Sequence, residues 1–426
     1  MKMGTLLSRS TRGEANLLVR RLACFGSAEM ITRVVRILSI VIIARQVSPQ
    51  MMGLAALALS IFEMVRVLAN AGIGQRIIAE SEENLQATCN TAHRLFWLWC
   101  LVVAAIQLSI AGGLALFDKP DIAAMLAVLA GVYLLMPGGL VQVFLLMRAQ
   151  RFGAIASIGA AQTISDHLLT LVLVLVWPSA WAIVLPKLLT APLWLVLARQ
   201  RMAWRPEPAA GYTAWQQFTG FALGVLISEI LVVARGQLDK LIVGWLFGVQ
   251  ALGIYYFAFN AGLGLTTSFI MALGQVLFPY LCKAGHATEC LRRGRVGLLL
   301  GLAVFTPLLA LQSGLAGWYV PLVFGEQWRD AAPLVAILVL GGVPMVFAAC
   351  ASAWWRANEF PATEAKWNSV VTAVCLGAIL LFSSLGLEMV AVAYVVGMAV
   401  IMIPVTLGAL FRARHHPAPI LEAAHA

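Results

Sequence analysis

Eleven ionisable side chains lie inside stretches of this sequence that are otherwise apolar. The cations are Arg33, Arg36, Arg66, Lys187, Arg235 and Lys240, and the acids are Glu29, Glu63, Asp166, Glu229 and Asp239. One charge at the centre of a bilayer costs about 2.5–3.5 kcal/mol on insertion scales, so the whole set would cost roughly 30 kcal/mol in contact with lipid. If the stretches cross a membrane, these groups must pair with one another or face water, which predicts a water-filled cavity.

The spacing of the charges indicates which of them can pair locally. Glu29 and Arg33 are four residues apart and Glu63 and Arg66 are three apart, so each pair shares one helix face. Arg235 and Asp239 are also four residues apart, whereas Arg36, Lys187 and Lys240 lack an obvious acid partner of their own nearby in the sequence. We therefore predict a cavity with a net charge of +1 that attracts anions. Its substrate-facing residues are Arg33, Arg36, Arg66, Lys187, Arg235, Asp239 and Lys240, with Glu29, Glu63 and Glu229 as its acids.

The dipeptide Asp166-His167 lies within another apolar stretch. Histidine changes its charge near neutral pH, so this pair is a candidate for proton coupling. A hydrogen-bonded contact in the protein core is the alternative interpretation, and the sequence leaves both open.

No catalytic signature accompanies these charges. The sequence has no Gly-Lys dipeptide, and therefore no P-loop, and it has no His-Glu-x-x-His motif. The loops predicted outside the cell, such as 118–121 and 325–330, are too short for a catalytic site. We expect a protein that is not an enzyme, with no catalytic residue, cofactor or bound metal.

The elements that must position the charges are membrane-spanning helices. The 426 residues are 61% apolar and only 11% charged, against about 25% charged in an average soluble protein. A spanning helix needs roughly 20 apolar residues. This predicts an all-α polytopic membrane protein with about twelve spans, near 17–44, 51–72, 92–116, 121–147, 154–177, 179–198, 218–247, 250–281, 296–322, 332–354, 367–386 and 388–411. The segment 70–75 should break a helix, and Pro137 should bend one.

The basic residues outside these spans follow the topology. Twenty Lys and Arg fall on one side and three on the other, which places the rich side and both termini in the cytoplasm. The net charge of +10 therefore reflects orientation, and no nucleic-acid partner is expected. Tryptophans, Trp328 among them, mark the predicted membrane interfaces.

The chain contains an internal repeat. Residues 42–58 align without a gap on 242–258, so that Gly53 pairs with Gly253, and the register continues to Gly74 and Gly274. A fixed offset indicates two homologous halves. With six helices each, these form bundles related by a pseudo-two-fold axis along the membrane normal. The predicted parts are a bundle at 1–201, a cytoplasmic linker at 202–215, a bundle at 216–414 and a cytoplasmic tail at 415–426.

With these motifs the chain resembles a known family of transporters. The resemblance rests on Asp239-Lys-Leu-Ile-Val-Gly244, Phe247-Gly248, Ala251-Leu-Gly-Ile-Tyr255, Ala258, Phe278-Pro279, Ala44-Arg45, Gly53-Leu-Ala55, Gly72-Ile-Gly74 and the turn at 148–152. It is similar to the Wzx-like oligosaccharide and polysaccharide flippases of the multidrug/oligosaccharidyl-lipid/polysaccharide exporter superfamily.

The resemblance implies a function and a place in the cell. Two bundles would face each other around a basic cavity and alternate between inward-open and outward-open states. The cargo would be an oligosaccharide repeat unit on a polyprenyl diphosphate, used for exopolysaccharide or O-antigen synthesis. The protein would lie in the bacterial inner membrane, among membrane lipids, and could join a polymerase and export complex.

Two other classes stay open at this point. One is a drug or cation exporter, or a lipid-precursor flippase, of the same superfamily, although a drug or cation exporter would favour an acidic cavity. The other is a membrane glycosyltransferase or an assembly partner that transports nothing.

Overall fold

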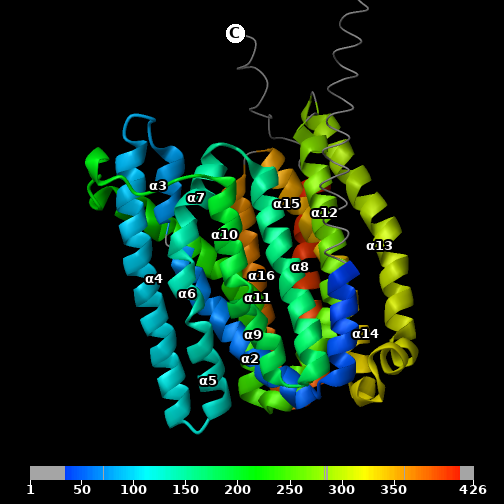
Figure 1. Ribbon diagram of the computed structural model, residues 1–426. Coiled ribbons are helices and arrows are strands. Elements are labelled where there is room, and N and C mark those ends of the chain that lie inside the picture. Colours follow the sequence, from blue (N-terminus) through cyan, green and yellow to red (C-terminus); the bar gives the residue numbers. More distant parts are fainter. Residues whose placement is uncertain (1–33, 71, 283, 285, 359, 413–426) are drawn as a thin grey trace, which may run out of the picture. The chain divides into compact units, whose positions relative to one another are not determined.

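Every regular element of the described chain is a helix (Figure 1). The computed structural model describes residues 34–412 except 71, 283, 285 and 359. Contacts divide the chain into two compact units. Unit 1 contains the residues up to Gln46 together with Phe62–Ile230, and unit 2 contains Val47–Ile61 together with the residues from Leu231 onward.

Unit 1 begins with a helix at residues 34–46 and includes the end of α2 (Pro49–Arg66) and the start of α11 (Gln216–Ala261). Its other elements are η1 (Val67–Asn70), α3 (Ile73–Ala79), α4 (Leu85–Leu116), α5 (Pro120–Leu129), α6 (Val132–Leu135), α7 (Pro137–Arg148), α8 (Phe152–Val176), α9 (Ala180–Leu189), α10 (Ala191–Arg201) and η2 (Pro208–Ala210). α4 and α5 run side by side as a hairpin (Figure 1).

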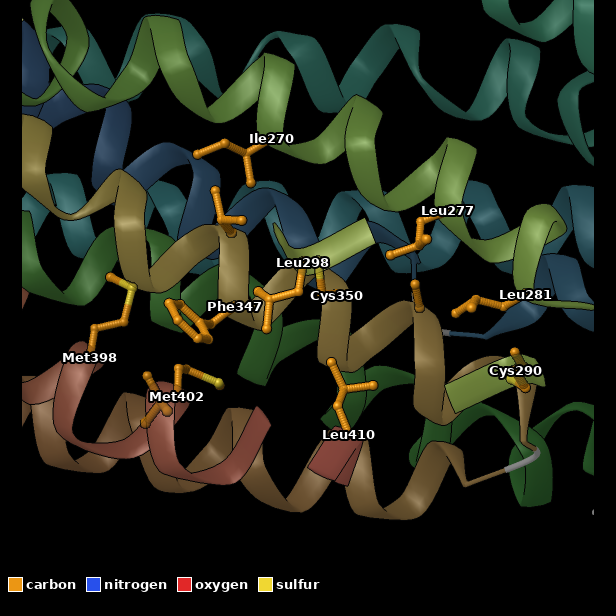
Figure 2. Packing of buried hydrophobic residues seen from close by; sticks show 14 of the residues in the cluster. Ile270, Leu277, Leu281, Cys290, Leu298, Phe347, Cys350, Met398, Met402 and Leu410 are labelled. Atoms are coloured by element: carbon orange, nitrogen blue, oxygen red, sulfur yellow. The ribbon is translucent and has the colours of Figure 1, made fainter. Parts of the chain in front are cut away.

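Unit 2 holds the rest of α2 and α11 and the helices that follow. These are α12 (Leu263–Cys282), α13 (Ala287–Phe324), η3 (Glu326–Ala331), α14 (Ala332–Leu340), α15 (Gly342–Ala357), α16 (Pro361–Leu381), η4 (Ser383–Leu385), α17 (Leu387–Leu407) and the π-helical turn η5 (Gly408–Arg412). Ile270, Leu277, Phe347 and Met402 belong to the apolar core between α12, α13, α15 and α17 (Figure 2).

The helices have the length and composition of membrane spans. Nine helices of the described chain can cross a membrane, or ten if α5 to α7 count as one bent span. The bend between residues 120–135 and 137–148 is 55° and falls at Pro137, as predicted. The break predicted at 70–75 is also present, since α3 begins only after Gly72. The first predicted span, 17–44, lies mostly outside the described residues, and the total of twelve stays a prediction.

The repeat hairpin of the second half turns at Gly248. This residue has φ +85° and ψ 175° inside α11, a conformation that side chains disfavour and that glycine adopts freely. The equivalent position in the first half is Ser48, whose hydroxyl accepts a hydrogen bond from the Met51 amide at 3.3 Å at the start of α2. The two hairpins therefore turn at equivalent positions by different local chemistry.

The two hairpins cross at the glycines that the repeat pairs. A Cβ atom on Gly53 would lie 1.8 Å from the Val249 carbonyl oxygen, and a Cβ on Gly253 would lie 1.8 Å from the Pro49 carbonyl oxygen. Pro49 and Val249 are themselves equivalent positions of the repeat. The contact is thus reciprocal, and it brings the two backbones as close as only small residues allow.

The segment η3 packs onto this crossing. The indole of Trp328 is fully buried and stacks on Phe257 with ring centroids 4.0 Å apart, while Gln327 donates to the Val47 carbonyl at 3.4 Å. Trp328, which the sequence predicts at a membrane interface, is thus a core residue of unit 2.

The predicted linker at 202–215 is fastened along α4. Asn90 donates to the carbonyls of Glu207 at 2.7 Å and Gly211 at 3.0 Å, and its own oxygen accepts from the Glu207 amide at 3.1 Å. The Arg94 guanidinium lies 3.7 Å from the Tyr212 ring centroid. The compact units also differ from the predicted bundles, because 216–230 belongs to unit 1 and 47–61 to unit 2. The division into bundles at 1–201 and 216–414 stays a prediction.

Candidate functional site

Unit 1 contains a cavity of about 440 Å³ inside its membrane-spanning helices. Its walls come from the end of α2 and from α3, α6, α7, α8, α9 and α10. The lining residues are Phe62, Glu63, Arg66, Gln75, Ile78, Val132, Met136, Leu140, Val143, Phe144, Met147, Gln162, Thr163, Asp166, Lys187, Thr190, Ala191 and Trp194. The volume lies within the roughly 300–1,000 Å³ usual for small-molecule sites.

An ion pair between α8 and α9 forms one side of the cavity. The Lys187 ammonium lies 2.6 Å from Oδ2 of Asp166, whose side chain is 11% exposed against 38% for Lys187. Such a pair offsets the desolvation of both groups. Lys187 has no evident partner in the sequence, because the two residues are 21 positions apart on different helices.

A second ion pair lies at the end of α2. Arg66 donates to one carboxylate oxygen of Glu63 through Nε at 2.9 Å and Nη2 at 2.6 Å. The local pairing that the i,i+3 spacing predicted is present. The Arg66 side chain remains 46% exposed, so its guanidinium is accessible from the cavity side of the helix.

The cavity also holds acceptors that the protein does not use. Oδ1 of Asp166 and Oε1 of Gln75 are buried and have no hydrogen-bond partner among the described residues. A buried acceptor without a partner costs about 1–3 kcal/mol. Both oxygens have almost no accessible surface, so they would accept hydrogen bonds from a ligand in the cavity once the Asp166 and Gln75 side chains turn toward it.

The position of Gln75 depends on how α3 is held. The Arg148 guanidinium donates to the carbonyls of Ile77 at 3.3 Å, Ile78 at 3.0 Å and Glu80 at the end of α3, which is where a cation suits the helix dipole. Beside Gln75, Gly74 leaves room for the Phe144 ring, because a Cβ there would lie 2.1 Å from that ring.

The turn after α3 adds a second anchor at Glu80. Its carboxylate accepts from the Thr88 hydroxyl at 2.9 Å and from the Ser81 amide at 3.1 Å, and it pairs with Arg76 at 2.9 Å. Burial acts to raise the pKa of Glu80, but these hydrogen bonds and the Arg76 charge together lower it below the ordinary value. The carboxylate therefore stays ionised at neutral pH and ties α3 to α4.

The other predicted site residues of the first half are only partly placed. Glu29 and Arg33 lie outside the described residues. Arg36 lies close enough to His167 to interact with it electrostatically, as do Asp166 and Lys187. The carboxylate of Asp166 is bonded to Lys187, a contact that the proposed Asp166-His167 relay did not anticipate.

Two predicted residues of the second half, Asp239 and Lys240, belong to unit 2 and are not among the lining residues of this cavity. Asp239 and Lys240 are buried in unit 2, where their charges are 3.2 Å apart. The Tyr255 hydroxyl donates to Asp239 at 3.3 Å, and the Lys240 ammonium lies 4.5 Å from the Phe259 ring centroid. Lys240 therefore has an acid partner after all, its neighbour in sequence. The side chains of Glu229 and Arg235 lie outside the description.

The sequence did not reveal two properties of the unit 1 cavity, namely the balance of its charges and the neutral side chains in its walls. Of the described lining residues, Glu63 and Asp166 are acidic and Arg66 and Lys187 are basic, so the cavity of unit 1 has no net charge. Gln75, Gln162 and Trp194 complete its walls. A glutamine inside an apolar span was the signal available for Gln162, whereas Gln75 falls in the predicted helix break at 70–75. The indole of Trp194 resembles any interface tryptophan until α10 is placed.

Comparison with known proteins identifies the family. The family model described as "Polysaccharide biosynthesis protein" matches residues 42–333, which is more than half of the chain. The lipopolysaccharide biosynthesis protein WzxC of Escherichia coli K12 is 26% identical over 312 residues, covering 71% of this chain and 62% of WzxC. The succinoglycan biosynthesis transport protein ExoT of Rhizobium meliloti is 25% identical over 318 residues, covering 72% of this chain and 62% of ExoT. The match thus spans about three fifths of these relatives.

Solved structures share the fold at low sequence identity. The lipid II flippase MurJ in an inward closed conformation matches with a TM-score of 0.72 and 11% identity, covering 90% of this chain and 87% of that one. An inward-facing multidrug resistance transporter of the MATE family matches with a TM-score of 0.66 and 13% identity, covering 89% and 94%. These likenesses establish a MATE- and MurJ-like helical fold. The chain is a multi-pass membrane protein that belongs to the polysaccharide biosynthesis protein family.

Proposed function

We propose that the protein is a flippase that carries a polyprenyl-diphosphate-linked oligosaccharide across the bacterial inner membrane for exopolysaccharide or O-antigen synthesis. It works by alternating access, with both termini in the cytoplasm, and no chemical bond of the cargo is broken. Twelve spans in two six-helix bundles provide the moving parts. Membrane lipids surround it, and a polymerase and export complex receives its product.

The observation that carries this proposal is the polar cavity inside the membrane-spanning helices of unit 1. Two ion pairs and several amide and hydroxyl groups face it. Because placing an ionisable group inside a membrane costs free energy, such groups usually mark a transport path. The names of WzxC and ExoT, which refer to lipopolysaccharide and succinoglycan synthesis, support a polysaccharide precursor as cargo.

The charge of the cavity bears on the alternative of a cation exporter. Such a cargo favours an excess of acid, whereas each carboxylate of the unit 1 cavity has a cation 2.6 Å away. The expected basic cavity would need cations beyond the four charged residues of this cavity. We propose Arg36 and Arg235 for this role, together with Arg33.

Reconstitution tests the function. The purified protein in liposomes is expected to move lipid-linked oligosaccharide, extracted from the producing bacterium, from the inner to the outer leaflet. The readout is the fraction of the oligosaccharide that an added lectin or glycosidase can reach. Liposomes that lack the protein give the background rate. A rate equal to that background, from protein that is folded and inserted, would contradict the proposal.

The membrane potential is expected to drive this movement. Each charge crossing 100 mV is worth about 2.3 kcal/mol. A diphosphate with two charges gains roughly 4–5 kcal/mol on leaving a negative interior, a bias of more than about a thousandfold. With the potential clamped and no pH gradient, the outward rate should rise as the interior becomes more negative. A rate that ignores the potential, follows a pH gradient and loses that response in Asp166→Asn would instead support the Asp166-His167 proton route.

A further inference from the structure

The cavity of unit 1 has the chemistry of a site for a neutral ligand that carries many hydroxyl groups. Both of its cations are already bonded to carboxylates at 2.6 Å, so neither a diphosphate nor an organic cation finds an uncompensated opposite charge there. What the described side chains leave unused is the ability to accept hydrogen bonds, at Oδ1 of Asp166 and Oε1 of Gln75.

The two unused acceptors belong to different helices. Asp166 lies on α8 and is 8% exposed, and Gln75 lies on α3, yet both line the same cavity. Their partners must be donors, because a carboxylate oxygen and an amide oxygen cannot bond to each other. Sugar hydroxyls are donors that carry no charge, and an oligosaccharide can offer one to each of the two oxygens.

The apolar walls fit the other property of a sugar. Phe62, Phe144 and Trp194 line the cavity from α2, α7 and α10, so aromatic side chains lie beside the polar ones. The C–H face of a pyranose packs on aromatic rings while its hydroxyls bond at the edge. A site of this kind, apolar with a few placed polar groups, is the usual form of a small-molecule pocket.

We infer that the cavity of unit 1 is the subsite for the sugar part of the cargo, with Gln75, Asp166 and Trp194 as its contacts, and that the diphosphate is bound outside it. This assignment rests on the proposed function and divides the cargo between two places. The substrate specificity of the protein then resides in unit 1, in neutral hydrogen bonds and stacking.

Two probes separate the subsites. The first is the oligosaccharide released by mild acid from the extracted lipid-linked oligosaccharide, and the second is undecaprenyl diphosphate without sugar. Binding of each, radiolabelled, is measured by equilibrium dialysis on the full chain in nanodiscs. Gln75→Leu and Trp194→Leu are each expected to weaken oligosaccharide binding about five- to tenfold, as loss of one neutral hydrogen bond or a comparable contact would. Binding of undecaprenyl diphosphate should change less than twofold.

The chain offers matched controls. Gln200→Leu and Trp177→Leu make the same replacements at exposed positions outside the cavity and should leave both probes unaffected. Gln75→Asn keeps the amide and should retain more oligosaccharide affinity than Gln75→Leu, provided that all variants elute as folded protein on size exclusion.

The outcomes are distinct. If the wild type binds the intact lipid-linked oligosaccharide but Gln75→Leu and Trp194→Leu keep full affinity for the free oligosaccharide, the subsite assignment is wrong and the proposed function stands. The assignment also fails if those variants lose undecaprenyl diphosphate equally, or if tetraphenylphosphonium competes for the same site. If the wild type binds and flips no lipid-linked oligosaccharide, the proposed function itself fails.

Discussion

Alanine at Gly53 or Gly253 is expected to force the two repeat hairpins apart. The new methyl group would start 1.8 Å from a backbone carbonyl oxygen, where real Cβ atoms keep at least 3.0 Å. A backbone oxygen cannot rotate away as a side chain can, so the helices must separate by about an ångström, an overpacking that costs about 1–3 kcal/mol or more. We expect the melting temperature in detergent to fall by about 5 °C for either variant. Polymer export should fall with it, because α2 also carries Glu63 and Arg66.

The reciprocity of the contact makes the double variant informative. A separation that admits one methyl group also makes room for the other, so Gly53→Ala/Gly253→Ala should be little less stable than either single variant. Gly112→Ala and Gly159→Ala are the controls, since a Cβ at those helical positions meets nothing within 4 Å. Alanine there should be neutral or slightly stabilising. Fully additive losses, or single variants as stable as the wild type, would contradict the crossing described here.

Methionine at Lys187 is expected to have the largest effect among the charged residues of the unit 1 cavity. It leaves the Asp166 carboxylate without its cation while that side chain is 11% exposed within the spanning helices. Breaking a buried pair by removing one partner costs about 3–5 kcal/mol. Because Lys187 is itself 38% exposed, we expect the lower end, which corresponds to a fall in melting temperature of about 3–6 °C in a chain of this length, together with poor accumulation in the membrane.

Removing the second charge should reverse much of this loss. Lys187→Met/Asp166→Asn no longer holds an isolated carboxylate, so it should accumulate better than Lys187→Met and melt at a higher temperature. Arg329→Met is the matched control, because Arg329 and Glu326 form an exposed pair with side chains 69% and 72% accessible. That change should leave the melting temperature unchanged, because exposed ion pairs contribute little to stability. If the double variant melts no higher than Lys187→Met, the loss of stability in Lys187→Met does not come from the unpaired Asp166 carboxylate.

Much of the fold follows from the sequence because apolar length and local breaks are local properties. The all-helical structure, the bend at Pro137 and the break before α3 appear where the residues place them. The Glu63–Arg66 pair is also local, since three residues separate its members on one helix.

What the sequence could not show depends on which helices become neighbours. Lys187 reaches Asp166 only because α9 packs on α8, and Arg148 caps α3 from the end of α7. The same holds for Asp239 and Lys240, which are adjacent in the sequence. Their burial in unit 2, where they pair with each other, depends on tertiary packing. A positive net charge counted along the chain therefore did not become a positive charge in the cavity of unit 1.

The reciprocal glycine crossing also bears on how such a chain could arise. Pro49 and Gly53 meet Val249 and Gly253 in the same way in both directions, which is the property of an isologous contact on a two-fold axis. In a homodimer of a half-length ancestor, one glycine per subunit would have made both contacts at once. After duplication and fusion of such an ancestor, each glycine would contact the other copy of the repeat. A larger side chain at either position would then disturb the packing of both copies.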